Sequence, residues 1–345
     1  MSTTTESDTT GVEVGKSRAL KVLAVTNLWP VGDSFRGIFV KEQVDALRQM
    51  GVAVDVEVVA QNRGKVDYLL AAARIRRKAR SGGYDVVHVH YGMSAWAARF
   101  VGRVPRVLSV YGSDVNVPWQ RAVTRIGSGG TAARIYVSPN LAANSGDRDG
   151  HVIADGVDFG LFCPGDRAEA RAALGYSPDE LVVLFGGHPD NHVKGYDVFT
   201  DVLAELRRRG LNVRELLIVA PDQPRSAVPA KFAAADVLLF TSRKGSEGSP
   251  SVIKEATVMG LPVVSVDVGD AAELLDGVHP SALVPFPEPW GSDEAREELV
   301  RTLADRAAEV LAAAARSNGR ERNARLDSRR VAEQVVAVYR QVLRR

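Results

Sequence analysis

Two glutamates flank the start of one predicted helix in the second half of the chain. The sequence GSEGSPSVIKEATVMG predicts a helix from Ser249 to Met259, because serine is a favourable N-cap, Pro250 suits the first turn and a glycine follows the end. Glu247 lies just before this helix and Glu255 lies about one and a half turns into it. We expect the two carboxylates to face one cleft at different depths, where they can accept hydrogen bonds from the hydroxyls of two rings.

The first turn of this helix is also a candidate phosphate site. Its free amides at Ser251 and Val252, together with the positive end of the helix dipole, favour an anion. In the simpler alternative, Glu247 only interacts with the dipole and Glu255 is a solvated helix residue. Lys194 follows the loop FGGHPDNHVKG, and its simplest interpretation is a solvated loop lysine.

The elements that must position these side chains alternate between apolar runs and helical patterns. Runs such as KVLAVTN, VAVDVEVVA and DVVHVHY are β-branched and apolar on both faces, as buried parallel strands require. After the turn-rich NSGDRDG the alternation restarts, which predicts a second α/β unit. Ligands of parallel sheets bind beyond the carboxyl ends of the strands, and all the candidate residues fall on such loops.

Length and composition agree with two globular domains. The chain has 345 residues, 45% of them hydrophobic and 25% charged. We expect a flexible tail over residues 1–17, domains over 18–155 and 156–325, and a C-terminal helix over 326–345.

Charge and cysteine content exclude several classes of protein. The net charge is +2, which does not favour a nucleic-acid partner, and one cysteine excludes an internal disulfide and a cysteine-based metal site. The polar start lacks the features of a signal peptide, and no apolar stretch is long enough to span a membrane. We therefore expect a cytoplasmic protein. A basic helix face that includes Arg74, Arg76, Arg77, Lys78 and Arg80 is either solvated or in peripheral contact with anionic lipid at the inner face of a membrane.

With seven residues between Glu247 and Glu255, EGSPSVIKE resembles the E-x7-E motif of family 4 glycosyltransferases. The segments FGGHPDNHVKG, ADVLLFTSRKGSEGSPSVIKEA and GLPVVSVDVGD follow the order of that family's second domain, and DVVHVHYG, VLSVYGSDV and VIADGVDFGLFCP resemble its first domain and hinge. The resemblance covers residues 20–280. Within the family, the sequences of these segments are similar to those of bacterial enzymes that build polysaccharides.

This resemblance implies the GT-B fold, in which two Rossmann-like domains with parallel sheets face each other across a cleft. The N-terminal domain would bind the acceptor and the C-terminal domain a nucleotide diphosphate sugar. Such enzymes transfer a hexosyl group to an acceptor hydroxyl with retention and without a metal ion, in glycan or natural-product biosynthesis. Two alternatives are a nucleotide-sugar epimerase, which needs no acceptor, and a non-catalytic protein that binds the nucleotide sugar.

Residue by residue, Glu247 would face the transferred sugar, Glu255 would bind the ribose, and Lys194 would neutralise the diphosphate. We expect His90 to join Glu247 and Lys194 in catalysis, and Tyr111 and Asp114 to contact the acceptor or sugar. The expected donor site consists of Gly37, Gly187, His188, Lys194, Glu247, Gly248, Ser249, Pro250, Ser251, Val252 and Glu255.

Further expectations qualify this site. His188 stands where the family commonly has arginine, so one phosphate contact is weaker, or His192 or Arg243 replaces it. Tyr111 stands where many members carry a histidine. His88 is expected in the core, and no third ligand stands near His88 and His90, so we expect no metal site. Gly37 and Ile38 begin a helix after the first strand, where their amides would approach the phosphates, unless the glycine only makes a turn.

Overall fold

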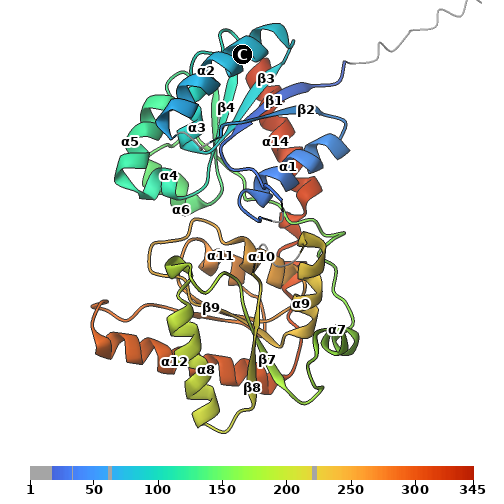
Figure 1. Cartoon of the computed structure of the whole chain (residues 1–345), viewed down its shortest axis with the longest axis vertical. Coiled ribbons are helices and arrows are strands. Elements are labelled where there is room, and N and C mark those ends of the chain that lie inside the picture. Colours follow the sequence, from blue (N-terminus) through green and yellow to red (C-terminus); the bar gives the residue numbers. More distant parts are fainter. Residues whose placement is uncertain (1–17, 33, 61–63, 220–223) are drawn as a thin grey trace, which may run out of the picture.

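The computed structural model contains two α/β domains stacked along the long axis of the molecule (Figure 1). The structure describes residues 18–32, 34–60, 64–219 and 224–345. The expected flexible tail, residues 1–17, lies outside the described residues. No helix in the described ranges is long and apolar enough to cross a membrane.

The first domain is built on a six-stranded parallel sheet with the order β2-β1-β3-β4-β5-β6. Its central strands are buried along their whole length, as their apolar sequences on both faces require. The strands are β1 (Lys21–Thr26), β2 (Ala53–Val58), β3 (Val86–His90), β4 (Arg106–Val110), β5 (Ala133–Tyr136) and β6 (His151–Val152). The first residues of the segment HVIADGVD therefore belong to the first sheet, on the N-terminal side of the division that we expected at 155–156.

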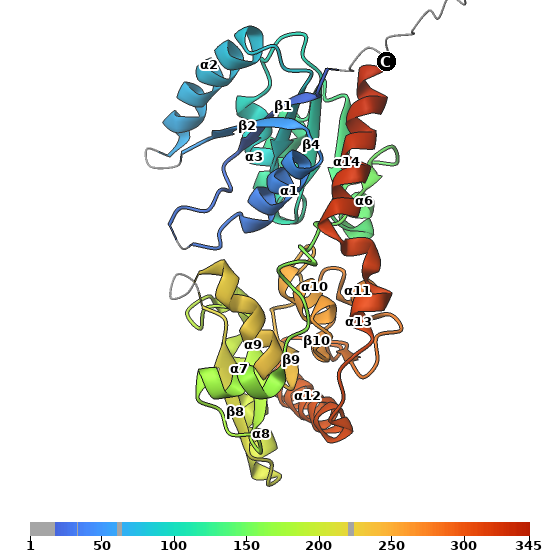
Figure 2. The same ribbon diagram turned by 90° about the vertical axis from the view of Figure 1, so that its right-hand side faces the viewer.

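Helices cover both faces of this sheet (Figures 1 and 2). One core holds α1 (Ile38–Gln49) and the C-terminal α14 (Ser328–Leu343) against one face. A second core holds α2 (Lys65–Ser81), α3 (Gly92–Ala97), α4 (Ser113–Asn116) and α6 (Pro139–Ser145) against the other. The remaining helix, α5 (Pro118–Gly127), packs on α3 rather than on the sheet.

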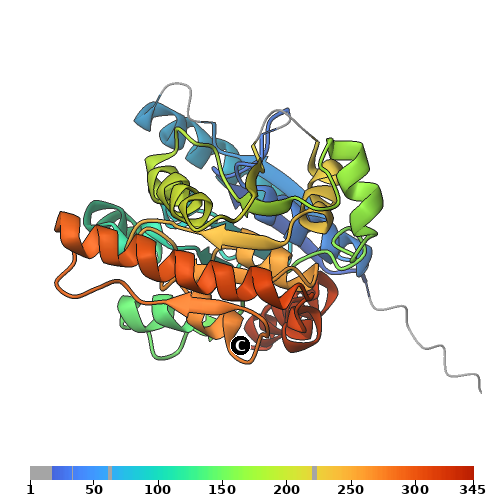
Figure 3. The same cartoon turned by 90° about the horizontal axis from the view of Figure 1, so that it is seen from below.

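The second domain repeats this architecture with a five-stranded parallel sheet in the order β11-β10-β9-β7-β8. Its strands are β7 (Leu181–Phe185), β8 (Val213–Leu217), β9 (Val237–Phe240), β10 (Val263–Val266) and β11 (Ala282–Val284). Its helices are α7 (Arg167–Leu174), α8 (Tyr196–Arg208), α9 (Val228–Ala234), α10 (Ser251–Val258), α11 (Ala271–Leu275), α12 (Asp293–Ala313) and α13 (Gly319–Arg322). Seen from below, α12 is the long orange helix that runs across this domain (Figure 3). The 3₁₀ turns are η1 (His192–Lys194), η2 (Arg225–Ala227) and η3 (Ala324–Leu326).

The chain crosses between the domains twice, and the two crossings lie side by side. Val157 donates its N–H to the Leu326 carbonyl at 2.8 Å, and Ser328 donates to the Val157 carbonyl at 2.9 Å. Gly156 allows this contact, because a Cβ there would lie 2.7 Å from the Cα of Ser328. The paired crossings return the chain to the first domain, where α14 completes the core. The expected divisions at 155–156 and 325–326 fall at these crossings and stay predictions.

Candidate active site

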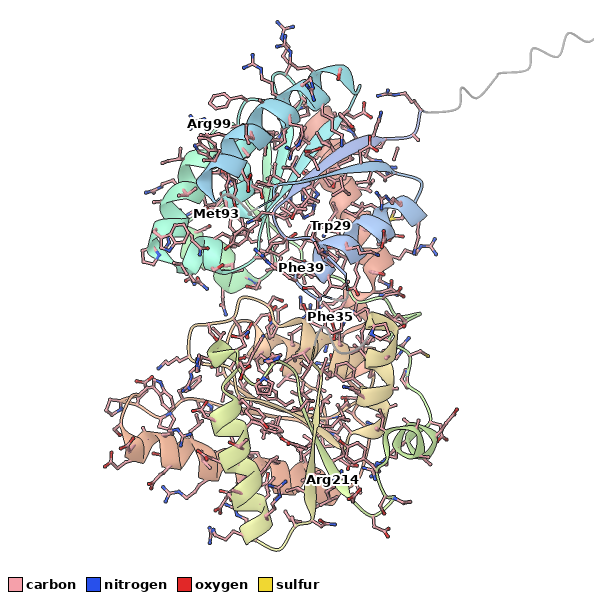
Figure 4. The ribbon with its side chains drawn as sticks, in the orientation of Figure 1. Trp29, Phe35, Phe39, Met93, Arg99 and Arg214 are labelled. Atoms are coloured by element: carbon pink, nitrogen blue, oxygen red, sulfur yellow. The ribbon has the colours of Figure 1, made fainter. Side chains whose placement is uncertain are left out.

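A cleft of about 500 Å³ separates the two domains. The first domain contributes the loop before α1 and the residue that follows β4, and Figure 4 shows Phe35 and Phe39 at the junction between the domains. The second domain contributes the loops after β7 and β9, and the start of α10. Both walls therefore consist of segments that follow the carboxyl ends of parallel strands, as expected for an α/β ligand site.

The helix at the cleft begins two residues later than its sequence predicts. Pro250 has φ −70° and ψ 113°, so it is the extended residue before α10 rather than a first-turn residue. The prediction that Ser249 caps the helix is wrong, because its hydroxyl is 2.6 Å from the Asp270 carboxylate instead. The N–H groups of Ser251 and Val252 have no acceptor among the described residues. Even without a side-chain cap, the helix start thus presents donors to the cleft.

Gly248 brings the two domains into contact at this helix start. A Cβ at Gly248 would lie 2.1 Å from the carbonyl oxygen of Tyr111 and 3.1 Å from the Cα of Gly112. Nearby, the Asn140 side chain donates to the Gly269 carbonyl at 2.8 Å, which is a second contact between the domains. Only glycine allows the backbones to approach this closely at position 248.

Lys194 and Glu247 form an ion pair on the floor of the cleft. The lysine Nζ lies 2.8 Å from Glu247 Oε1, and the Ser242 hydroxyl donates to the same oxygen at 2.8 Å. Gly195 fixes the loop that carries the lysine, because its φ is 67° and a Cβ there would lie 2.0 Å from the Thr241 carbonyl oxygen. The lysine charge and the helix start therefore face the same space from two different loops, as lining residues of one cleft.

Glu255 lies deeper in the cleft, in a bridge that joins the two domains. Arg225 Nη2 is 2.7 Å from Glu255 Oε1, and Arg225 Nε is 2.9 Å from Glu42 Oε1 on α1. Burial alone lowers the pKa of Arg225, but the Glu255 and Glu42 carboxylates raise it above its ordinary value. Burial raises the pKa of Glu42, although Arg225 opposes the shift. Glu255 Oε2 has no hydrogen-bond partner among the described residues and is open to a ligand hydroxyl.

Tyr111 forms part of the opposite wall and is backed by a buried histidine pair. Its hydroxyl lies 2.7 Å from His90 Nδ1, and its ring lies 4.7 Å from that of Phe39. Burial lowers the pKa of His90 to about 3, so the ring is neutral, and burial raises the pKa of Tyr111 well above its ordinary range. His90 is fully buried and is not among the residues that line the cleft. It can act on a ligand only through Tyr111, which corrects our expectation of a directly catalytic histidine.

Asp114 also lies behind the cleft wall. It is fully buried, and its carboxylate accepts hydrogen bonds from the backbone N–H groups of Gly92, Tyr111 and Gly112. Its carboxylate therefore shapes the loop after β4 and is not free for the acceptor contact that we expected. His88 lies in the core as predicted, with Nδ1 2.5 Å from the Tyr339 hydroxyl and Nε2 2.8 Å from the Ser109 hydroxyl.

The structure places most of the expected donor residues on one surface. Residues that line the cleft are Gly187, His188, Lys194, Glu247, Gly248, Ser249, Pro250, Ser251, Val252 and Glu255, with Tyr111 opposite. Gly37 lies between the lining residues Arg36 and Ile38, where its φ of 76° starts α1. The Ile38 amide is already bound to the Phe35 carbonyl at 3.1 Å, so it is not the free donor that we expected.

Neither proposed replacement for the missing family arginine reaches the cleft. Arg243 is held by Asp197 at 2.9 Å and by the His192 carbonyl at 3.3 Å, and neither Arg243 nor His192 is a lining residue. His188 does line the cleft, and Arg36 lines it from the first domain. The groups of this cleft that can donate to an anion are therefore Lys194, His188, Arg36 and the helix-start amides.

Sequence reasoning missed several polar residues of this site. Asp155 lines the cleft, and its Oδ2 lies 3.8 Å from Nζ of the buried Lys254, which has no hydrogen-bond partner in the described part of the chain. Burial raises the pKa of Asp155, and Lys254 opposes that shift. The other missed residues are Glu42 and Arg225. In the described ranges, no group of three or more histidine, cysteine, aspartate or glutamate side chains is arranged to hold a metal ion.

Comparison with known families matches both halves of the chain. The family described as "Glycosyl transferases group 1" matches residues 180–305, and the family described as "Glycosyl transferase 4-like domain" matches residues 30–149. The matched ranges contain every residue that lines the cleft except Asp155.

Curated relatives include a D-inositol 3-phosphate glycosyltransferase 1 from Catenulispora acidiphila, 28% identical over 76% of this chain and 73% of that protein. The D-inositol 3-phosphate glycosyltransferase of Mycolicibacterium gilvum is 31% identical over 60% of this chain and 57% of that protein.

Among solved structures, sucrose-phosphate synthase from Thermosynechococcus elongatus has a TM-score of 0.73 at 20% identity, over 94% of this chain and 99% of that one. Anabaena HepE in complex with UDP-glucose has a TM-score of 0.66 at 20% identity, over 93% of this chain and 100% of that one. At these identities, the structural likeness shows the two-domain fold.

Proposed function

Since the chain belongs to the group 1 glycosyl transferases, we propose that it moves a hexosyl group from a uridine diphosphate sugar to an acceptor hydroxyl. The chain is a glycosyltransferase of GT-B architecture that uses a nucleotide-sugar donor. The observation that carries the finer proposal is the convergence of Lys194, Glu247 and the start of α10 on one cleft. Uridine is the first base to test, because HepE, which shares the fold, was solved with UDP and with UDP-glucose.

We propose a position for each part of the donor. The free amides of Ser251 and Val252 face the diphosphate together with Lys194, so positive charge meets it from two sides. The open Oε2 of Glu255 accepts from the ribose hydroxyls. Glu247, already oriented by Lys194 and Ser242, lies beside the transferred sugar.

The reaction breaks the bond between the anomeric carbon and the diphosphate oxygen and forms a bond from that carbon to the acceptor oxygen. Negative charge grows on the departing diphosphate, where Lys194 and the amides stabilise it without reorganising. Positive charge grows on the sugar, and the Glu247 carboxylate favours it. We propose retention of configuration, with the acceptor attacking the face that the diphosphate leaves and its hydroxyl proton passing to the leaving group.

We further propose that no metal ion takes part. The lysine and the helix-start amides of this cleft supply positive charge at the place where a metal ion would otherwise bind the diphosphate. The expected consequence is that turnover does not depend on added divalent cations.

The curated relatives carry the name D-inositol 3-phosphate glycosyltransferase, so D-inositol 3-phosphate is the first acceptor to test. Polysaccharide fragments and small natural products follow. We propose that the reaction takes place in the cytoplasm, with peripheral contact to the inner face of a membrane.

Product analysis separates this function from its two alternatives. Purified protein is incubated with UDP-sugars in the presence and absence of acceptors, and both UDP and glycosylated product are measured. A transferase releases UDP in step with product. An epimerase changes the donor without an acceptor, and a non-catalytic binding protein releases no UDP; either result would contradict the proposal. Glu247→Gln serves as the inactive control.

A further inference from the structure

The nearly neutral net charge of the chain hides a strongly basic segment. Residues 68–146 contain eleven arginines and lysines against two aspartates, Asp85 and Asp114, a net charge of +9, whereas the whole chain has a net charge of +2. The rest of the chain is therefore net negative. Asp114 is fully buried and Asp85 is paired with Arg18, so neither presents a free carboxylate to balance the surface arginines of this segment.

Three of these arginines extend from α2 without an ionic partner. Arg74 and Lys78 pair with Glu57 on β2. By contrast, Arg76, Arg77 and Arg80 are exposed and make no side-chain hydrogen bond or ion pair within the described part of the chain. Their spacing places them along the outer face of the helix, opposite the buried Ala71, Ile75 and Ala79.

Large apolar side chains share this surface with the arginines. Eleven large apolar side chains are exposed in the described ranges, and six of them lie on α2, just after α3 or on α5. Leu69 and Leu70, about two turns before Arg76 and Arg77, are 59% and 51% exposed. The others are Val66, Phe100, Trp119 and Ile126. A cluster of this kind marks an interaction surface.

The three helices form one continuous layer on the outside of the first domain. Helix α3 lies between α2 and α5 and contacts both (Figure 1). The contact between α3 and α5 is close. A Cβ at Gly92 would lie 1.9 Å from the Thr124 hydroxyl oxygen, and a Cβ at Gly127 would lie 2.7 Å from the backbone nitrogen of Trp96. Figure 4 shows Arg99 between α2 and α5, so the basic side chains continue across the layer.

We propose that this layer, comprising α2, the end of α3 and α5, docks on an anionic lipid bilayer. Leu69 and Leu70 enter the interface, and the unpaired arginines of α2 meet the lipid headgroups. Trp119 is an interfacial anchor at the other end of the layer. Leucine and tryptophan gain from burial in lipid, whereas a nucleic-acid surface built on phosphate contacts would have no use for the exposed aliphatic pair. A lipid surface therefore accounts for both the charge and the apolar side chains.

This docking leaves the donor cleft free. The layer covers the face of the first sheet opposite α1 and α14, and its residues are not those that line the donor cleft. The inference does not rest on the proposed donor or acceptor, because binding to lipid is measured without turnover.

The test is co-sedimentation of the full chain with vesicles of phosphatidylcholine, with and without a minor fraction of phosphatidylglycerol. We expect binding only to the anionic vesicles, weakened by added salt. The variant R76Q/R77Q/R80Q should bind about 100-fold more weakly, since each arginine near an anionic surface contributes about 1 kcal/mol. The variant L69S/L70S should bind about tenfold more weakly, because the lost apolar burial amounts to about 1.4 kcal/mol or more.

The matched control is R208Q/R301Q/R306Q, which removes the same charge from exposed positions of α8 and α12 in the second domain. It should bind vesicles like the unmodified protein. A cooperative thermal unfolding transition confirms that every variant is folded. Failure of the unmodified protein to bind anionic vesicles overturns the proposal. An equal loss of vesicle binding in the control variant also overturns it. So does tight binding to heparin or DNA, if the L69S/L70S variant binds both that polyanion and the vesicles as well as the unmodified protein does.

Discussion

Replacing Arg225 with methionine removes the charge that bridges the two domains. In the structure this guanidinium lies 2.9 Å from Glu42 on α1 and 2.7 Å from Glu255 on α10. The side chains are 17% exposed for Arg225 and Glu42 and 7% exposed for Glu255. Methionine fills much of the same space but leaves two carboxylates close together without a counter-charge.

The expected loss of stability is about 3 kcal/mol. Removing one partner of a buried ion pair costs roughly 3–5 kcal/mol, and the lower end applies because these side chains keep some contact with water in the cleft. Since 1 kcal/mol corresponds to about 2 °C or somewhat more in a protein of this size, the melting temperature should fall by about 6 °C. The second variant, Glu42→Gln with Arg225→Met, should recover about 1 kcal/mol because one orphaned carboxylate is gone.

Thermal unfolding at two pH values checks this reasoning. Burial raises the pKa of Glu42, and in the Arg225→Met protein no guanidinium opposes this shift, so the Glu42 carboxylate destabilises the fold at neutral pH and less so as it protonates. The deficit should therefore shrink between about pH 7 and about pH 5. A melting temperature within about 1 °C of the unmodified protein would refute the argument. So would a double variant less stable than Arg225→Met alone.

Three other outcomes are expected. Gly248→Ala should lower kcat/KM by roughly 10-fold or more, because its Cβ would overlap the Tyr111 carbonyl and hold the domains apart at an overpacking cost of about 1–3 kcal/mol; an unchanged kcat/KM would mean that the domains need not approach there. Burial lowers the pKa of His90 to about 3, against an unfolded value of 6.5, so the ring stays neutral in the folded protein. As the pH falls below 6.5, the unfolded chain takes up a proton that the folded protein does not, and the fold loses stability. Urea unfolding of His90→Gln should therefore show about 2 kcal/mol less loss between pH 6.5 and pH 5 than the unmodified protein, and a parallel loss would contradict the burial argument. Removing divalent cations with EDTA should leave turnover unchanged, and a loss restored by magnesium would overturn the metal-free proposal.

Local patterns predicted the parts of the site that depend on one segment each. The sheet strands and the chain segment around α10 follow from apolar runs and from the SPS helix start. Glu247 and Glu255 were found because each stands at a fixed place relative to that helix, and Lys194 was found through the resemblance to the family. Parallel strands bring such loops to one edge of a sheet, so sequence position alone indicated a common cleft.

Tertiary contacts decided the parts that the sequence did not predict. Arg225 lies in a short 3₁₀ turn, and its partner Glu42 is 183 residues away in the other domain, so no local pattern connects them. Ser249 has the composition of an N-cap, but Asp270, 21 residues later, takes its hydroxyl. Asp114 follows a strand as a ligand residue would, yet three backbone amides occupy its carboxylate.

The most direct test of the donor site is the thermal shift of the purified protein with UDP, GDP, ADP and dTDP, repeated on Lys194→Ala. The control is Lys244→Ala, since Lys244 lies in the loop between β9 and Glu247 but pairs with the exposed Glu288 and does not line the cleft. The account predicts that one diphosphate stabilises the unmodified and control proteins and that Lys194→Ala loses most of this shift, because a charged hydrogen bond contributes about 1.5–3 kcal/mol. No shift with any of the four diphosphates, or an undiminished shift in Lys194→Ala, would contradict it.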